Sequence, residues 1–169
     1  MAYSDADWAG DTTDRKSTTG SLIKIAGGPI YWRSTKQGGV SLSTTEAEYI
    51  AASETAKNVI ATRSILKEIA ITELNFAFPL LIDNTGSIAV SSGKKVTRNA
   101  RYIDIRYHHI RDLIQKGLIK VTHVSSNQMA ADGFTKALPE PKFKEFRDMI
   151  GVSGQIEPEI DGRDRLEED

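Results

Sequence analysis

Hydrophobic and polar positions divide the first third of the chain into short apolar runs separated by polar, glycine-containing turns. This pattern predicts strands over residues 2–8, 20–26 and 29–34, with a loop over 9–19. Gly27 and Gly28 separate the second run from the third and predict a tight hairpin. Consecutive strands joined by short turns favour an antiparallel meander.

A long amphipathic helix is predicted after the third strand. Ser43 and Glu46 have the spacing of a capping box, with Ser43 as the N-cap and Glu46 reaching back. An apolar stripe follows at mostly three- and four-residue steps and is interrupted at Arg63. Its members are Ala52, Ala56, Val59, Leu66 and Ile69.

The second half of the chain alternates strands with helices. Apolar runs predict strands over 76–83 and 118–124, and amphipathic patterns predict helices over 85–91, 100–116, 128–137 and 141–150. Helical crossovers add strands in parallel. The expected fold is therefore α/β, a five-stranded mixed sheet with strands 1–3 antiparallel, strands 4 and 5 as parallel additions, and flanking helices.

Composition narrows the possible sites. The 169 residues include no cysteine and three histidines, which excludes disulfides and thiolate metal sites and favours carboxylates holding a hard cation. Residues 155–169 carry a net charge of −5, which leaves +4 on residues 1–154. We therefore expect one domain over 1–154, mildly basic, and a disordered acidic tail over 155–169. No apolar run approaches the ~18 residues of a membrane span, and no signal-peptide pattern is present.

Four acids follow or end predicted core elements, where rigid structure would hold them together: Asp5, Glu48, Asp83 and Asp132. Carboxylates packed closely raise one another's pKa, and a pair of divalent cations removes that penalty. Acids at strand ends and helix starts also serve as caps, and each of the four has this structural alternative. Glu46 is assigned to capping, since it lies about 200° around the helix from Glu48. Periodicity does not separate Asp5 from Asp7, because both share one face of a strand.

Six motifs carry a resemblance to a known family: YSDADWAGD (3–11), DRKSTTG (14–20), LSTTEAEYIAA (42–52), IDN (82–84), YIDIRYHHIRD (102–112) and ADGFTK (131–136). In this order they resemble the ribonuclease H domain of Ty1/copia-type retrotransposon Pol polyproteins. The resemblance covers residues 2–150. One such motif is weak evidence, whereas six in order make chance similarity very unlikely.

The resemblance implies the ribonuclease H fold and a catalytic, metal-binding set of four acids. It selects Asp5, which follows a hydroxyl residue, over Asp7, and it adds Glu48, Asp83 and Asp132. The implied activity is hydrolysis of the RNA strand of RNA–DNA hybrids with two Mg²⁺ ions, for which Mn²⁺ can substitute. The implied partner is a reverse transcriptase in the parent polyprotein, with the isolated domain monomeric. The implied location is a cytoplasmic virus-like particle or the nucleus, with no membrane attachment.

Substrate contacts are expected from two groups of residues. Hydroxyl and amide side chains beside the acids suit the 2′-hydroxyl groups of RNA; these are Ser43, Thr44 and Asn84. Basic residues that follow the Asp83 segment suit phosphates; these are Lys94, Lys95, Arg98, Arg101 and Arg106. Helix capping and a solvated basic face are the respective structural alternatives.

The histidines and one motif position depart from what this family usually has. Many ribonucleases H carry a mobile loop histidine about ten residues before the last acid. Here the nearest, His123, lies in a predicted strand and is expected to be structural. Adjacent His108 and His109 lack metal-ligand spacing. Tyr102 stands where the copia-type motif usually has histidine.

Two other functions fit the same fold. The first is a catalytically silent module that binds nucleic acid or supports a reverse transcriptase. The intact set of four acids argues against it. An integrase-like enzyme that acts on DNA is the second. That class uses three acids at other spacings, and Glu48 in the first helix argues against it.

Overall fold

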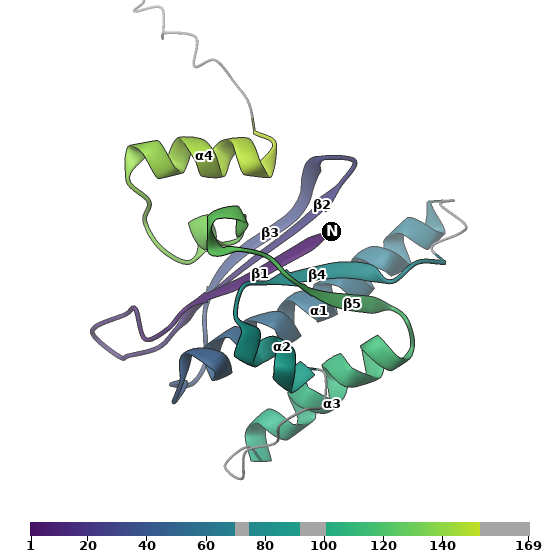
Figure 1. The fold of residues 1–169 in the computed structure, drawn as a ribbon, viewed down its shortest axis with the longest axis horizontal. Coiled ribbons are helices and arrows are strands. Elements are labelled where there is room, and N and C mark those ends of the chain that lie inside the picture. The colour runs from purple at the N-terminus through teal and green to yellow at the C-terminus, as the bar shows by residue number, and fades with distance from the viewer. Residues whose placement is uncertain (70–74, 92–100, 153–169) are drawn as a thin grey trace, which may run out of the picture.

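The computed structural model describes the backbone of residues 1–69, 75–91 and 101–152, and the side chains of residues 1–69, 75–89 and 108–152. Its centre is a five-stranded mixed sheet in the order β3-β2-β1-β4-β5 (Figure 1). The strands are β1 (Ala2–Asp7), β2 (Thr18–Ile25), β3 (Gly28–Lys36), β4 (Phe78–Ile82) and β5 (Ile119–His123). β1, β2 and β3 are antiparallel, and β4 and β5 are added in parallel. The expected fold class is confirmed.

Four α-helices and two short 3₁₀ turns complete the described residues. They are α1 (Thr44–Glu68), α2 (Thr85–Ser91), α3 (Arg101–Gln115), η1 (Ser126–Gln128), η2 (Asp132–Phe134) and α4 (Glu140–Ile150). None of the described helices is long and apolar enough to cross a membrane. The acidic tail expected over 155–169 lies outside the described residues.

The helix predicted over 128–137 is wrong, because η1 and η2 occupy this region as separate single turns. In η2 the backbone N–H of Thr135 donates to the Asp132 carbonyl, a three-residue bond of 3.0 Å. Gly133 disfavours a longer helix. It also lies against the ring of Phe146, so tertiary packing decides the conformation of this segment.

The hairpin between β2 and β3 turns one residue earlier than predicted. Its two central residues are Ala26 (φ 50°) and Gly27 (φ 83°), and Ile25 pairs with Gly28. Two consecutive positive φ angles are typical of a type I′ turn, whose twist matches that of the strands. Ala26 therefore adopts a left-handed conformation that a tight hairpin requires.

The start of α1 follows the prediction in part. The Ser43 hydroxyl accepts from the backbone N–H of Glu46 at 3.1 Å, as an N-cap does. The Glu46 carboxylate, however, accepts from the backbone N–H of Leu42 at 2.8 Å, one residue before the cap. Capping therefore occupies Glu46, as expected, through a neighbouring donor.

The buried stripe of α1 starts earlier than the hydrophobic pattern indicated, at Ala47, and ends earlier, at Leu66. Arg63, which interrupts the pattern, is 5% exposed. Its guanidinium donates to the Phe76 carbonyl at 2.8 Å and lies 6.0 Å from the centre of the Phe76 ring. Ile69, assigned to the stripe, is 64% exposed and forms the C-cap, so that assignment is wrong.

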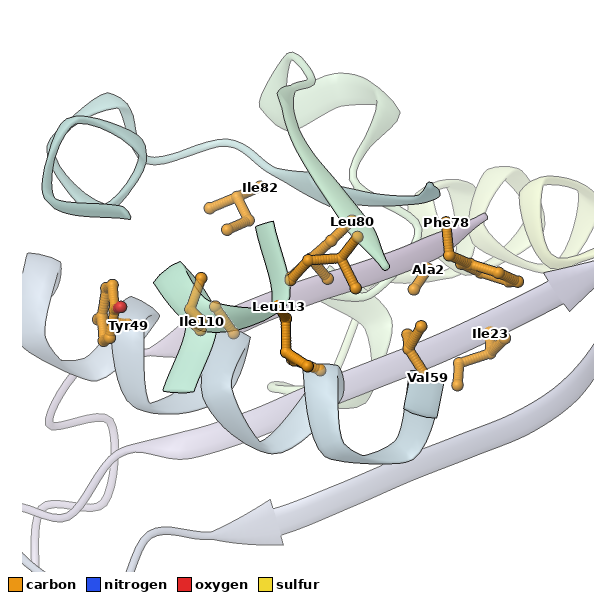
Figure 2. Close-up of a cluster of buried hydrophobic side chains, with 12 residues drawn as sticks. Ala2, Ile23, Tyr49, Val59, Phe78, Leu80, Ile82, Ile110 and Leu113 are labelled. Carbon is orange, nitrogen blue, oxygen red and sulfur yellow. The ribbon is translucent and has the colours of Figure 1, made fainter. Parts of the chain in front are cut away.

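The hydrophobic core lies between the sheet and the helices α1 and α3. Figure 2 shows Tyr49 and Val59 of α1 beside Ile110 and Leu113 of α3, facing the strands. The strands contribute Ala2, Ile23, Phe78, Leu80, Ile82 and Ile119. This core fixes the position of α1 against β1 and β4.

On the second face of the sheet lies η2, and α4 packs on η2. Ser21 bonds to Thr55 of α1, whereas its neighbour Gly20 contacts the segment around η2. Successive residues of a strand point to opposite faces, so α1 and η2 lie on opposite sides of β2. In Figure 1 the strands run between α4 and α3. Phe146 of α4 packs edge-on against Phe134 of η2, with ring centres 5.1 Å apart.

Candidate metal centre

Three acids from three separate elements converge at one edge of the sheet. Asp5 lies in β1, Glu48 in the second turn of α1, and Asp83 directly after β4. Each offers a carboxylate oxygen, and these three oxygens all lie within 4.8 Å of one another. The structure therefore brings together three of the four predicted acids.

The sheet itself creates the space in which these acids meet. β1 and β4 pair in parallel only at Ala2 with Leu80 and at Tyr3 with Leu81. Beyond Tyr3 the two strands no longer pair, and Asp5 lies past this point. Because β1 and β4 run in the same direction, their carboxyl ends meet at one edge, the usual place for a site in such sheets.

Glu48 reaches this edge from α1 as a buried carboxylate. Its Oε1 accepts from the backbone N–H of Ala6 at 3.2 Å. Its Oε2 is buried and has no hydrogen-bond partner among the described residues. A buried carboxylate oxygen without a partner is costly and is satisfied by a proton or a cation.

Burial separates the two aspartates that periodicity left equivalent. Asp5 is 6% exposed and belongs to the group of three, whereas Asp7 is only half-buried and lies outside that group. The local geometry therefore favours Asp5 as the candidate ligand.

The electrostatics of the site disfavour the simultaneous charging of all its acids. Burial, followed by the charges of Asp5 and Asp83, raises the pKa of Glu48 from 4.5 to about 9. Burial, followed by the charges of Asp83 and Asp132, raises the pKa of Asp5 from 3.8 to about 6. Like charges in a site of low dielectric have this effect, and a divalent cation reverses it.

Asp132 lies beside the group of three without being part of it. It is the first residue of η2, its side chain is 31% exposed, and it pairs with Lys136 at 2.5 Å. Its charge nevertheless contributes to the raised pKa of Asp5. The fourth acid is thus near enough to act electrostatically on Asp5, and its carboxylate is engaged with a lysine.

Two hydroxyl groups that the sequence did not identify contact the acids directly. The Ser126 hydroxyl donates to Oδ2 of Asp83 at 2.8 Å, and the Thr135 hydroxyl lies 3.1 Å from Oδ2 of Asp5. Thr135 and Lys136 belong to the same ADGFTK motif as Asp132, so a signal for them was present. Ser126 lies in a polar segment without periodicity and had none.

His123 contacts the backbone of the site. It ends β5, and its Nε2 lies 3.2 Å from the carbonyl oxygen of Asp83. This contact ties the end of β5 to the residue after β4.

The predicted substrate contacts fall into two groups. Ser43 caps α1, Thr44 is exposed at its start, and the Asn84 side chain accepts from the Ser87 backbone N–H at 2.9 Å, as a cap of α2 does. The predicted basic residues belong to parts that the structure leaves undescribed. Lys94, Lys95 and Arg98 lie outside the described residues, and the side chains of Arg101 and Arg106 in α3 are not described.

Known proteins similar to this chain are of two kinds. The chain is 39% identical over 150 residues, 89% of its length, to the retrovirus-related Pol polyprotein from transposon TNT 1-94 of Nicotiana tabacum. It is 39% identical over 151 residues to that from transposon RE2 of Arabidopsis thaliana. It spans about a tenth of the length of these relatives, 11% and 10%. No family model matches the chain.

Among solved structures, the chain resembles the RNase H1 named LC11, solved in complex with an RNA/DNA hybrid. The TM-score is 0.58 at 12% identity, and the match covers 84% of this chain and 97% of that one. A likeness at this identity concerns the fold. The sheet order and the helices described above are therefore those of the ribonuclease H fold.

Proposed function

From the premise that this chain is homologous to one segment of the Pol polyproteins of Ty1/copia-type transposons and has the ribonuclease H fold, we propose that it hydrolyses the RNA strand of RNA–DNA hybrids. The observation that carries this proposal is the group of Asp5, Glu48 and Asp83, whose oxygens lie within 4.8 Å of one another. Asp132 is the fourth acid of the proposed site.

The residues present suit Mg²⁺ or Mn²⁺. All three convergent ligands are carboxylates, the donors that hard cations prefer. Oε2 of Glu48 is buried without a partner among the described residues, and the pKa of both Glu48 and Asp5 is raised. A pair of bound cations would supply a nucleophilic water near neutral pH and stabilise charge on the leaving oxygen.

In this mechanism the acids would hold the cations, and the fold keeps the acids in place. Asp5 and Asp83, at the ends of adjacent strands, provide the rigid part of the site. Glu48 closes it from the first turns of α1, anchored by the backbone N–H of Ala6. Asp132, which pairs with Lys136 in the structure, would be the fourth carboxylate to hold the cations.

The remaining roles concern the substrate and the parent protein. Ser43 and Thr44 lie at the start of α1, about one turn before Glu48, and Asn84 lies directly after Asp83, where they would contact the 2′-hydroxyl groups of RNA. The basic residues from Lys94 to Arg106 would contact phosphates. A reverse transcriptase of the same polyprotein would produce the hybrid.

Cleavage of an end-labelled RNA–DNA hybrid with Mg²⁺ or Mn²⁺ tests this proposal, with the wild type beside Asp83→Asn. We expect cleavage of the RNA strand only, and a loss of at least about a hundred-fold in the variant, because it removes one of the convergent carboxylates. Duplex DNA and single-stranded RNA of the same sequence are expected to remain intact.

Asp112→Asn is the matched control. Asp112 is a half-buried acid of α3, paired with Lys116 at 2.7 Å and outside the group of three. This variant should cleave like the wild type. A folded wild type that leaves the hybrid intact with Mn²⁺ at high protein concentration would contradict the proposal and favour the catalytically silent module. Cleavage of duplex DNA would point to an integrase-like enzyme.

A further inference from the structure

The Thr135 side chain links two acids that lie far apart in the sequence. Thr135 is 6% exposed, and its Oγ1 lies 3.1 Å from Oδ2 of Asp5 and 2.8 Å from the carbonyl oxygen of Asp132. It is the residue after η2, so it belongs to the turn that carries Asp132. One hydroxyl therefore contacts both the first acid and the backbone of the last.

A hydroxyl has one hydrogen, and the competing acceptors decide where it goes. The Asp132 carbonyl already accepts from the backbone N–H of Thr135 at 3.0 Å. Oδ2 of Asp5 is a carboxylate oxygen, and a hydrogen bond to a charged acceptor is roughly twice as strong as one to a neutral acceptor. The Thr135 hydroxyl therefore donates preferentially to the ionised Asp5 carboxylate, and the Asp132 carbonyl shares the same hydrogen as a second acceptor.

Gly20 makes this contact possible. It pairs directly with Asp5 across β1 and β2, so the two residues face the same side of the sheet. A Cβ atom at Gly20 would lie 2.5 Å from the Ala131 carbonyl oxygen and 2.8 Å from Cγ2 of Thr135. The absence of a side chain at this position lets the segment 131–135 lie directly on the strand beside Asp5.

We propose that Thr135, seated on Gly20, is a positioning residue that fixes the Asp5 carboxylate for cation binding. The bond to Oδ2 restricts the rotation of this carboxylate, and its other oxygen would remain available to a cation. Because the same turn carries Asp132, Thr135 also couples the positions of the first and last acids. This inference rests on the proposed metal site, and it does not depend on which nucleic acid is cleaved.

Mn²⁺ affinity, measured by electron paramagnetic resonance of the free ion, tests the role of Thr135 without activity. Thr135→Val keeps the shape of the side chain and removes its hydroxyl. We expect about ten-fold weaker Mn²⁺ binding, since a bond to a charged group is lost. Thr135→Ser restores the hydroxyl and should bind Mn²⁺ like the wild type. With the hybrid, Thr135→Val should lower kcat and leave KM unchanged.

Thr55→Val is the matched control. Thr55 is fully buried in α1 and bonds to Ser21 at 2.7 Å, away from the acids. This variant loses a buried hydroxyl contact and stability, and its Mn²⁺ affinity should be unchanged. If Thr135→Val does not fold, as judged by circular dichroism, Thr135→Ala removes the same hydroxyl without adding a methyl group beside Asp5.

Three results would overturn the inference. Wild-type affinity in the folded Val or Ala variant would show that the hydroxyl has no role in cation binding. An equal loss in Thr55→Val would show that the effect is one of general stability. A wild type that binds no Mn²⁺ would overturn the proposed metal site together with this inference, whereas the first two results leave the metal site standing.

Discussion

Glu48 is the side chain whose burial costs the fold most when no cation is bound. It is buried in the first turns of α1 beside two other acids, and one of its oxygens has no partner among the described residues. In this position a carboxylate is more favourable than a neutral side chain only when a cation binds beside it. The residue therefore lowers the stability of the metal-free fold in favour of binding.

Glu48→Gln is expected to stabilise the metal-free protein by about 2 kcal/mol at pH 8, because glutamine is neutral without the proton that Glu48 must take up on folding at this pH. The pKa of Glu48 is about 9 in the folded state against 4.5 ordinarily. Between these values the folded state holds the additional proton, so wild-type stability falls as pH rises. The advantage of the variant should grow over the same range. Urea denaturation with a chelator at pH 5 and pH 8 measures it.

Glu46→Gln is the control for the loss of a charge in the same part of α1, since the Glu46 side chain accepts a hydrogen bond from the Leu42 backbone N–H and lies outside the group of three acids.

Mg²⁺ should stabilise the wild type more at pH 8 than at pH 5, because it binds the deprotonated acids. A wild type whose stability in chelator rises between pH 5 and pH 8 would contradict this account of Glu48.

At the scale of single residues, the sequence identified the acids and missed their hydroxyl partners. Asp5, Glu48 and Asp83 occupy strand ends and a helix start, positions that hydrophobic periodicity locates. Thr135 contacts Asp5 across 130 residues of sequence. No local pattern encodes such a contact, because it depends on how η2 packs against the sheet.

At the scale of elements, the turn η2 shows how tertiary packing overrides local preference. The sequence predicted a helix over 128–137, and the structure has a single 3₁₀ turn around Asp132. Its conformation is set by two packing contacts, one with Gly20 of β2 and one with the Phe146 ring of α4. The strands and the long helix were predicted well because their apolar stripes face one core. The buried Arg63 escaped prediction because its charge is satisfied by the Phe76 carbonyl, a contact outside its own helix.

Gly20→Ala tests the seating of η2 on the sheet. The added Cβ would approach the Ala131 carbonyl oxygen to 2.5 Å, a backbone atom that cannot move without shifting the turn. We expect a loss of about 2 kcal/mol in the free energy of unfolding, as for other insertions into packed sites, and weaker Mn²⁺ binding. Denaturation and the Mn²⁺ titration measure the two effects.

Gly38→Ala provides the comparison, since a Cβ at Gly38 would have no heavy atom within 4 Å. This variant should match the wild type in stability or exceed it slightly, because alanine restricts the unfolded chain. Equal effects of the two substitutions would mean that Gly20 matters for backbone freedom and not for close packing.

At the scale of the whole molecule, the sheet separates two layers with different roles. α1 and α3 enclose the hydrophobic core, and α1 also supplies Glu48. On the other face, η2 and α4 form a thinner layer that supplies Asp132. This second layer contacts the sheet at Gly20 and through a hydrogen bond from the Lys24 ammonium to the Met149 carbonyl. Within the layer, Phe146 packs on Phe134.

Phe146→Ala is expected to loosen this second layer selectively. Phe146 is 7% exposed and packs on Gly133, so its truncation should cost about 3 kcal/mol locally. Hydrogen exchange should accelerate in residues 131–135 and in α4, and the amides of β1 should keep their protection. Phe143→Ala, at a ring that is 51% exposed, should change exchange little. Uniform acceleration across the sheet would contradict the division into two layers.

Because β1 lies in the middle of the sheet, the order of translation decides when the four acids can come together. Of the five strands of this sheet, β1 is made first and can pair with β2 as soon as β2 is made, whereas its other neighbour, β4, follows only after β3 and α1. Asp132 and Thr135 arrive later still. A nascent chain can therefore complete its three-stranded meander early, and its four acids come together only when the translation of this region is nearly finished.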